Sequence, residues 1–461
     1  MPRRTIQENG ITEGVIWKQL LYFFFPILFG TFFQQLYNTA DAIIVGQFVG
    51  KEALAAVGGS TGTIIMLLVN LFVGVSSGAT VVIAQHYGAR RLEEVSDAVH
   101  TSMALAVTAG AVITVLGLVL SPWALSAMST PSDILPYALT YIRIYFVGTI
   151  ASFIYNIGSG ILRAVGDTRR PLYFLIISCL TNIVLDLLLV LGFKMGVAGA
   201  GLATILSQVV SAVLVLRTLL RADWPLCVDR KQIKFHRQPV QEILRIGVPA
   251  GIQSDMYTLS NLIIQTCING FGTNTVAAWT AFGKVDGFYW MIIAAFGVSI
   301  TTFVGQNFGA QKYKRVRKSV RTCLLMALGT TVLMSTLFVF GMQTMLRLFT
   351  NDPAVLELGQ VMTHYMCPFY FTYICIEVLS GAIRGTGVSL APTIITCMGV
   401  CVLRVIWIMV LVPLRPELST VLISYPLSWT LTSVIFMGYY LHGGWMRKRI
   451  MQLGLAPENE N

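Results

Sequence analysis

The sequence predicts an all-α polytopic membrane protein, with twelve transmembrane helices in two six-helix bundles. Hydrophobic residues make up 55% of the 461 residues and charged residues only 11%, which is too apolar for a chain of soluble domains. Twelve apolar runs are each about 20 residues or longer, which is enough to cross the hydrocarbon of a bilayer. Two separate segments also recur at one fixed spacing, which indicates an internal duplication.

The apolar runs fall into two sets of six, separated by the most polar interior segment of the chain. The first set lies at about 15–46, 54–84, 97–121, 135–162, 171–193 and 197–220, and the second at about 242–268, 275–306, 319–346, 357–383, 391–413 and 418–444. The polar segment between the sets is typical of a linker on one side of the membrane. We therefore expect an amino-terminal lobe at 1–220, a cytoplasmic linker at 221–241 and a carboxy-terminal lobe at 242–461.

The duplication rests on two motif pairs. SGILRAVGDTRRP (159–171) matches SGAIRGTGVSLAP (380–392), and IAQHYGARRLEEV (83–95) matches VGQNFGAQKYKRV (304–316), both at an offset of 221. Six crossings return the chain to its starting side. The halves should therefore share one orientation, related by a pseudo-two-fold axis along the membrane normal, with a cleft between them.

Both motifs have a structural interpretation. The Gly-Ala pairs at 88–89 and 309–310 should end long helices, and the charged stretches after them suit short amphipathic segments. Gly166 and Gly387 should punctuate turns between helices. We assign no chemistry to these loops.

The basic residues predict the orientation. Most Lys and Arg residues lie in segments on the side of the amino terminus, whereas the loops on the other side hold only Lys51, Lys194, Arg347 and Arg415. This asymmetry places both termini in the cytoplasm, and we expect the chain to lie in the cell (inner or plasma) membrane. The net charge of +11 then reflects topology and not a nucleic-acid partner.

Polar residues inside the first helix are the first candidates for function. Gln34, Asn38 and Asp41 lie at i, i+4 and i+7 and share one helix face, close to Tyr37. A carboxylate within a spanning helix is costly and usually marks an ion path, a proton relay or a buried partner. We expect Asp41 to face a water-filled cavity and to bind the cation that drives transport.

A second polar stripe runs through the helix at 171–193, where polar residues are spaced by four, and a third begins the next helix. The stripes contain Ser178, Asn182 and Asp186, then Thr204 and Gln208. If two acids, an amide and a hydroxyl converge, they suit either a shared proton or a hard monovalent cation such as Na⁺. The predicted cation site is Asp41, Asn182, Asp186 and Thr204, and the predicted substrate cavity contains Gln34, Tyr37, Asn38, Ser178, Gln208, Asp255 and Tyr257.

Structural alternatives stay open for these residues. The polar groups can instead hydrogen-bond helices together, and Asp186 can pair with Arg143. The acids have no counterparts in the second half, where Asp186 maps onto Trp407, which favours function over a scaffold role. The second half has its own charges within helices, and among them Lys284 and Asp286 can neutralise one another; the set is Asp255, Lys284, Asp286, Glu377 and Arg404. Tyr257, Tyr289, Trp290 and Met291 are candidates either for a cavity wall or for packing.

The first helix also contains Pro26 and Gly30. These residues allow the helix to bend and are therefore hinge candidates.

No phosphate-binding loop, HExxH helix or CxxC pair is present, so we expect no enzyme, no cofactor and no metal beyond Na⁺. The eight cysteines lie mostly in apolar runs and are typical of reduced packing residues.

The chain resembles the MATE family of multidrug and toxic compound extrusion transporters. The resemblance rests on QQLYNTADAIIVGQFVGKEALAAVG (34–58), the paired SG-x-x-R-x-x-G loops and the Q-x-x-GA helix ends, and it covers nearly the whole length. It implies export of bulky, amphipathic, often cationic compounds in exchange for H⁺ or Na⁺ as two lobes rock around a central cleft. The family's first-lobe cation site matches Asp41, Asn182, Asp186 and Thr204, as in its DinF-type branch, and the family's first-helix proline matches Pro26. Near the position of an acidic residue in NorM-like members stands Tyr257, with Asp255 two residues away.

Other functions remain as alternatives. A flippase for lipid-linked oligosaccharides or lipids would need more cationic residues in its cleft than Arg143, Lys284 and Arg404 provide. A membrane-embedded enzyme lacks a catalytic motif here, and a channel suits two rocking halves less well. We expect a monomer whose partners are small molecules and the lipid bilayer.

Overall fold

The computed structural model describes residues 11–128, 130–442 and 444–453, except for the side chains of Lys51 and Ser60, and the described residues contain helices but no strands. The first half contains α1 (Ile16–Phe48), α2 (Lys51–Gly58), α3 (Ser60–Gly88), α4 (Leu92–Ala127), α5 (Leu135–Val147), α6 (Thr149–Ala164), α7 (Arg169–Asp186), the π-helix η1 (Leu187–Gly192) and α8 (Gly196–Leu220). The second half contains α9 (Arg237–Asn269), α10 (Thr273–Gly309), α11 (Tyr313–Leu346), α12 (Pro353–Met366), the 3₁₀-helix η2 (Cys367–Thr372), α13 (Ile374–Gly385), α14 (Leu390–Thr396), the π-helix η3 (Cys397–Val402), α15 (Leu403–Leu414), α16 (Leu418–His442) and α17 (Trp445–Gln452).

These helices reproduce the predicted spans. Ten segments of the described chain are long and apolar enough to cross a membrane, and α5 with α6, bent by 48° at their junction, makes an eleventh. The remaining predicted span corresponds to α9, which is 33 residues long but carries more polar residues than the others. Helices of this length, with all backbone hydrogen bonds made internally, are what a bilayer requires.

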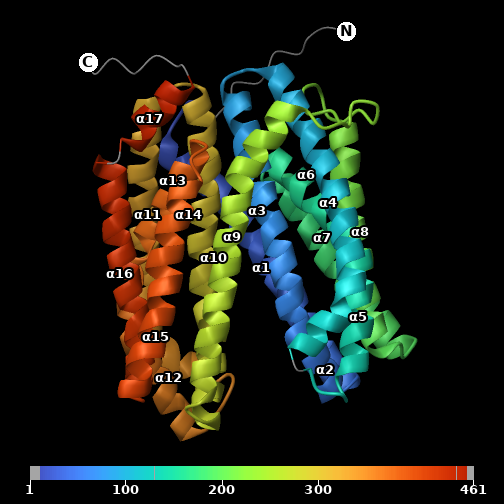
Figure 1. Cartoon of the computed structure of the whole chain (residues 1–461), viewed down its shortest axis with the longest axis vertical. Helices are drawn as coiled ribbons and strands as arrows, with labels where there is room; N and C mark the ends of the chain where they lie inside the picture. Colours follow the sequence, from blue (N-terminus) through green and yellow to red (C-terminus); the bar gives the residue numbers. More distant parts are fainter. Residues whose placement is uncertain (1–10, 129, 443, 454–461) are drawn as a thin grey trace. The chain divides into compact units, whose positions relative to one another are not determined.

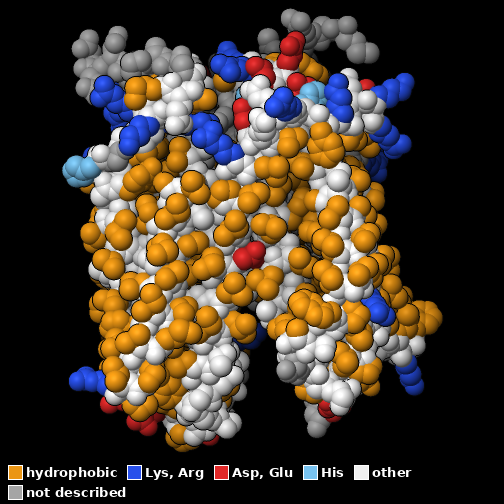
Figure 2. Space-filling view, in the orientation of Figure 1, with side chains coloured by type: hydrophobic (Ala, Val, Ile, Leu, Met, Phe, Trp, Pro, Cys, Tyr) orange, Lys and Arg blue, Asp and Glu red, His pale blue; other side chains and the backbone are white. Residues whose placement is uncertain are grey.

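The surface agrees with a membrane location. On the face shown in Figure 2, hydrophobic side chains cover the middle of both parts of the molecule. Within one part, Lys and Arg side chains gather at the end that carries α17, and within the other they gather at the end that carries the loop between α8 and α9 (Figures 1 and 2). An apolar surface with basic residues concentrated at one end is expected of a membrane-spanning protein.

Internal contacts divide the chain into two units. The amino-terminal unit contains Phe25–Gly251, and the carboxy-terminal unit contains the described residues before Phe25 together with those from Ile252 onward. Both boundaries fall inside long helices, α1 and α9, and each lies within three residues of a proline, Pro26 or Pro249. The predicted lobe boundaries at 220 and 242 stay a prediction. The linker packs on the amino-terminal unit, where the Asp229 backbone N–H donates to His100 Nε2 at 3.0 Å.

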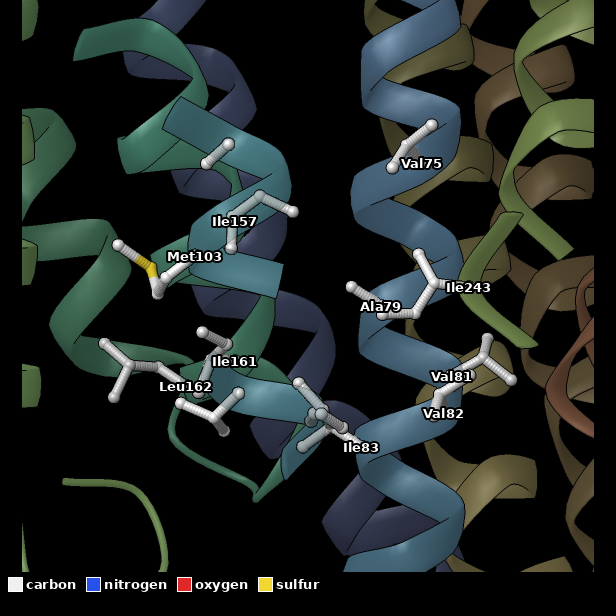
Figure 3. Close-up of a cluster of buried hydrophobic side chains, with 14 of the residues drawn as sticks. Val75, Ala79, Val81, Val82, Ile83, Met103, Ile157, Ile161, Leu162 and Ile243 are labelled. Carbon is white, nitrogen blue, oxygen red and sulfur yellow. The ribbon is translucent and has the colours of Figure 1, made fainter. Parts of the chain in front are cut away.

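The core of the amino-terminal unit is formed by α3, α4 and α6, with contributions from α8 and the first turns of α9 (Figure 3). Val75 and Ala79 lie on α3, Met103 on α4, Ile157 on α6 and Ile243 on α9. These side chains are buried away from lipid and water, and their close packing fixes the positions of the helices.

Glycines let α3 and α9 touch backbone to backbone within this unit. A Cβ on Gly74 would lie 2.3 Å from the Gly251 backbone nitrogen, and one on Gly78 would lie 2.4 Å from the Ile243 carbonyl oxygen. On the α9 side, a Cβ on Gly247 would lie 2.5 Å from the Val75 Cα. Each helix therefore presents a Gly-x-x-x-Gly pair at the crossing, the arrangement that allows spanning helices to approach most closely.

The internal repeat is visible in the backbone. The helices α3 and α10 end at Gly88 and Gly309, as predicted, and equivalent residues two positions later, Arg90 and Gln311, have φ of 57° and 58°. Gly166 and Gly387, at φ of 107° and 87°, occupy the predicted turns, where a residue with a Cβ would be strained.

One expectation about these loops is wrong. The charged stretches after the Gly-Ala pairs do not form separate short surface helices, because α4 starts at Leu92 and α11 at Tyr313 and each runs on into a long span. The charges occupy the first turns of those helices, where they remain close to the membrane surface.

Candidate functional site

Three helices of the amino-terminal unit place polar side chains in successive layers. On α7, Ser178, Asn182 and Asp186 are spaced by four residues and followed by the apolar Val190 in η1, so they form one stripe along the helix. The same four-residue spacing links Tyr37, Asp41 and Val45 on α1, and Gln208, Thr204 and Ala200 on α8. Each helix thus contributes an upper polar layer, a middle layer with the predicted cation ligands, and an apolar floor.

The floor holds the middle layer in register. Val45 of α1, Tyr141 of α5, Val190 of η1 and Ala200 of α8 belong to one buried apolar cluster. Because these residues lie one helical turn from Asp41, Asp186 and Thr204, packing of the cluster brings the polar residues toward a common centre.

The middle layer contains two acids that are close enough to repel one another. Asp186 is fully buried and Asp41 is only 6% exposed. Both carboxylate oxygens of Asp186 and Oδ1 of Asp41 have no hydrogen-bond partner, and the same holds for both amide atoms of the fully buried Asn182. Unpaired buried carboxylates and amides are costly, so this cluster is a strong candidate to hold a positive ion.

The structural alternatives fail for Asp186 and Asn182. Arg143 is exposed and does not pair with Asp186, whose oxygens are both unpartnered. Asn182 does not join helices, since its amide makes no hydrogen bond. The alternative does hold for Ser178, which donates to the Ser207 carbonyl of α8 at 2.8 Å. Thr204 bonds within its own helix to the Ala200 carbonyl at 3.1 Å.

A small cavity of about 120 Å³ lies beside the upper polar layer. This volume has room for a few water molecules. Its wall includes four of the predicted substrate residues and both hinge candidates, namely Gln34, Tyr37, Ser178, Gln208, Pro26 and Gly30. Tyr37 and Tyr145 both hydrogen-bond Gln208. Asp41 is not on this wall, in contrast to our expectation, because it lies one helical turn below it. The Tyr37–Gln208 hydrogen bond therefore lies in the layer between cavity and acids.

The carboxy-terminal unit holds a larger cavity of about 610 Å³, in the size range of pockets for drug-like molecules. Its aromatic wall comes from α9, α10, the α12–α13 segment and α16, and contains Tyr257, Trp279, Trp290, Tyr373, Tyr425 and Trp429. Trp290 meets Tyr373 and Trp429 edge to face, with ring centroids 4.8 and 5.7 Å apart. Such edges and faces are favourable contacts for a flat apolar ligand.

The predicted residues of the second half separate into two groups. Tyr257 and Trp290 line this cavity, whereas Tyr289 is packing, with its hydroxyl donating to the Tyr370 carbonyl at 3.0 Å. Asp255 and Asn38 do not line either of these two cavities, and their assignment to a substrate cavity stays a prediction.

The suggested pairing of Lys284 with Asp286 is also wrong. Lys284 is exposed, whereas the buried Asp286 accepts hydrogen bonds from the Tyr370 hydroxyl and, at 2.6 Å, from Trp290 Nε1. Both carboxylate oxygens of Asp286 are therefore occupied by neutral donors of its own unit.

Two arginines at the same position of the repeat were missed as site residues. Arg163 lines the small cavity and Arg384 the large one, 221 residues further on, each from the SG-x-x-R motif. Nε of each is buried without a partner, and Arg384 donates to Gln253 Oε1 at 2.9 Å. The repeated SG-x-x-R motif indicates that both arginines occupy equivalent positions. They were not predicted as site residues because the motif was interpreted as a turn between helices.

No group of three or more His, Cys, Asp or Glu side chains that could hold a metal ion lies in the part of the chain that the structure describes. The acid pair with its amide and hydroxyl neighbours suits a monovalent cation or a proton instead, because such ions need fewer charged ligands.

Comparison with known proteins identifies the family. The profile of the MatE family matches residues 26–188 and again residues 249–410, so each half of the chain carries one copy. The chain belongs to the MatE family. The double match also confirms the internal duplication inferred from the motifs, and the MATE resemblance of the sequence is correct.

Individual relatives agree with this assignment. The chain is 27% identical over 462 residues to "Probable multidrug resistance protein YoeA" of Bacillus subtilis (strain 168), covering 97% of this chain and 99% of that protein. A solved MATE structure in a bent conformation has a TM-score of 0.88 at 23% identity, covering 98% of this chain and 99% of that one. A transporter of the MOP superfamily from Pyrococcus furiosus, described as having a binding pocket of reversed polarity, has a TM-score of 0.89 at 22% identity, covering 98% and 100%.

The MATE assignment settles the broad questions. The all-α fold with twelve spans in two lobes is confirmed by these structural neighbours. The chain is a multi-span membrane transporter of a multidrug efflux family, with small-molecule substrates, and it is not an enzyme.

Proposed function

We propose that this MATE protein is a secondary antiporter that exports amphipathic compounds in exchange for H⁺ or Na⁺. The observation that carries the proposal is the buried cluster of Asp41, Asn182 and Asp186, in which Asp41 Oδ1 and all the side-chain polar atoms of Asn182 and Asp186 lack partners among the described residues. A coupling cation would supply the missing positive charge, and Thr204 completes the ligand set with a hydroxyl oxygen.

Coupling follows if the cation and the substrate favour different conformations. Binding a cation between the acids removes their mutual repulsion, which allows α1 and α7 to approach. The Tyr37–Gln208 layer then transmits this movement to the small cavity, and Pro26 and Gly30 give α1 a place to bend. Each ligand shifts the equilibrium by its differential affinity for the two conformations, so cation entry drives substrate release.

The remaining parts of this proposal come from the sequence and from the large cavity. The uneven distribution of basic residues supports cytoplasmic termini in the plasma membrane. The MATE resemblance supports bulky, often cationic, amphipathic substrates, and the aromatic cavity of about 610 Å³ has room for a bulky, flat molecule. No cofactor besides the coupling ion is needed, and we expect the monomer to be sufficient.

Flux measurements test this function. In proteoliposomes of the purified chain, addition of ethidium or 1-naphthoate should stimulate either a lumenal pH change or ²²Na⁺ flux, and the ion that responds is the coupling ion. Empty liposomes and a collapsed ion gradient are the controls. Substrate movement that continues at the same rate without any gradient would remove antiport from the account.

A further inference from the structure

The large cavity of the carboxy-terminal unit contains a cationic side chain that forms no ion pair within the described chain. Arg404 of α15 lines this cavity and is only 3% exposed. No described carboxylate oxygen lies within 4.0 Å of its guanidinium nitrogens, and its buried Nε has no hydrogen-bond partner. A buried guanidinium of this kind normally has an anion beside it.

The local contacts hold Arg404 without neutralising it. Its Nη2 donates to Ser428 Oγ at 3.0 Å, and its guanidinium carbon lies 4.0 Å from the ring centroid of Tyr425 and 6.0 Å from that of Trp429. The contact with the Tyr425 ring restrains the guanidinium, and one neutral acceptor leaves most of its five N–H donors available. The group is therefore preorganised to receive a planar or tetrahedral anion.

The two acids on the same wall are already occupied. Asp286 accepts from Tyr370 and Trp290, and Glu377 accepts from Tyr373 and lies in the field of Arg384. Glu377 is held against α10, where a Cβ on Gly297 would lie 2.2 Å from its Oε1. Of the two cations on this wall, Arg384 lies in the field of Glu377 and donates to Gln253, so Arg404 is the one with most of its donors available to a ligand.

We propose that this cavity binds aromatic substrates through an anionic group, a carboxylate or a phosphate, held by Arg404. The aromatic part of the ligand then lies against Trp279, Trp290 and Trp429, and the anion forms a charge-assisted, bidentate contact with the guanidinium. This inference rests on the proposed export function, since it names one substrate class of the exporter.

Calorimetric titration of the purified chain tests the proposal with one ring system in different charge states. The probes are 1-naphthoate, 1-naphthyl phosphate, the neutral 1-naphthamide and the cationic 1-naphthylmethylammonium. We expect at least one of the two anions to bind the wild-type chain about tenfold or more tightly than the amide and the ammonium compound. If both anions bind more tightly than the amide and the ammonium compound, the site accepts anions in general. If only one anion does, that anionic group is the one the site favours.

Variants then locate the contact. Arg404→Met should reduce the affinity for the anion to that for the amide, Arg404→Lys should retain part of it, and Lys284→Met, which changes an exposed cation outside the cavity wall, should leave it unchanged. If neither anion binds wild type more tightly than naphthamide, if the ammonium compound binds more tightly than both anions, or if a folded Arg404→Met keeps the full anion affinity, the proposal is overturned. The wild-type comparison decides the matter even if Arg404→Met does not fold. No ion gradient is used, so failure here leaves the coupling proposal intact, and failed coupling leaves this result interpretable.

Discussion

Asp41→Asn and Asp186→Asn are each expected to abolish cation-driven export. Each change removes one of two buried carboxylates that have unpartnered oxygens, and asparagine neither binds a proton at that position nor supplies a full negative charge to Na⁺. Coupling free energies between sites are typically about 1–3 kcal/mol, so the stimulation of export by the ion gradient should fall by about tenfold or more.

The measurement is gradient-driven transport of ethidium or 1-naphthoate in proteoliposomes that contain equal amounts of protein. Asp133→Asn is the matched control, because this acid is exposed and lies in the loop before α5. Transport by Asp41→Asn or Asp186→Asn at the wild-type rate, with the wild-type dependence on the gradient, would remove that residue from the coupling mechanism.

Gly74→Ala is expected to destabilise the amino-terminal unit. The added methyl group would lie 2.3 Å from the Gly251 nitrogen and 2.5 Å from the Gly247 carbonyl oxygen, and a backbone cannot move aside as a flexible side chain can. Forcing atoms into a packed site typically costs about 1–3 kcal/mol, so the apparent melting temperature in detergent should fall by about 2–12 °C.

Gly329→Ala of α11 is the control for this substitution. A Cβ at Gly329 meets nothing within 4 Å, so the same chemical change should have little effect or slightly stabilise the helix. If Gly74→Ala has the same apparent melting temperature as Gly329→Ala and the wild type, the close crossing of α3 and α9 does not exist as described.

The span pattern was predictable from sequence because a bilayer imposes length and hydropathy on each helix independently of its neighbours. The predicted run at 418–444, for example, is observed as α16, Leu418–His442. The predicted run at 242–268 is likewise observed within α9, Arg237–Asn269.

The stripes on α1, α7 and α8 predicted the cation site because four-residue spacing fixes a helix face. Spacing does not fix the depth at which helices pack, so the sequence placed Asp41 on a cavity wall when Tyr37 occupies that layer. The sequence also does not show which side chain contacts a buried carboxylate. Lys284 and Asp286 are two residues apart and point to different faces of α10, where Trp290, at i+4, reaches the carboxylate.

The most direct test of the account is the cation stoichiometry of the purified chain. Equilibrium ²²Na⁺ binding, and the number of protons released when substrate is added at a fixed neutral pH, should show that wild type carries at least one cation that the Asp41→Asn/Asp186→Asn double variant does not carry, while Asp133→Asn matches wild type. If the double variant binds as many sodium ions and releases as many protons as the wild type, the buried acids do not hold the coupling cation and the proposed mechanism is wrong.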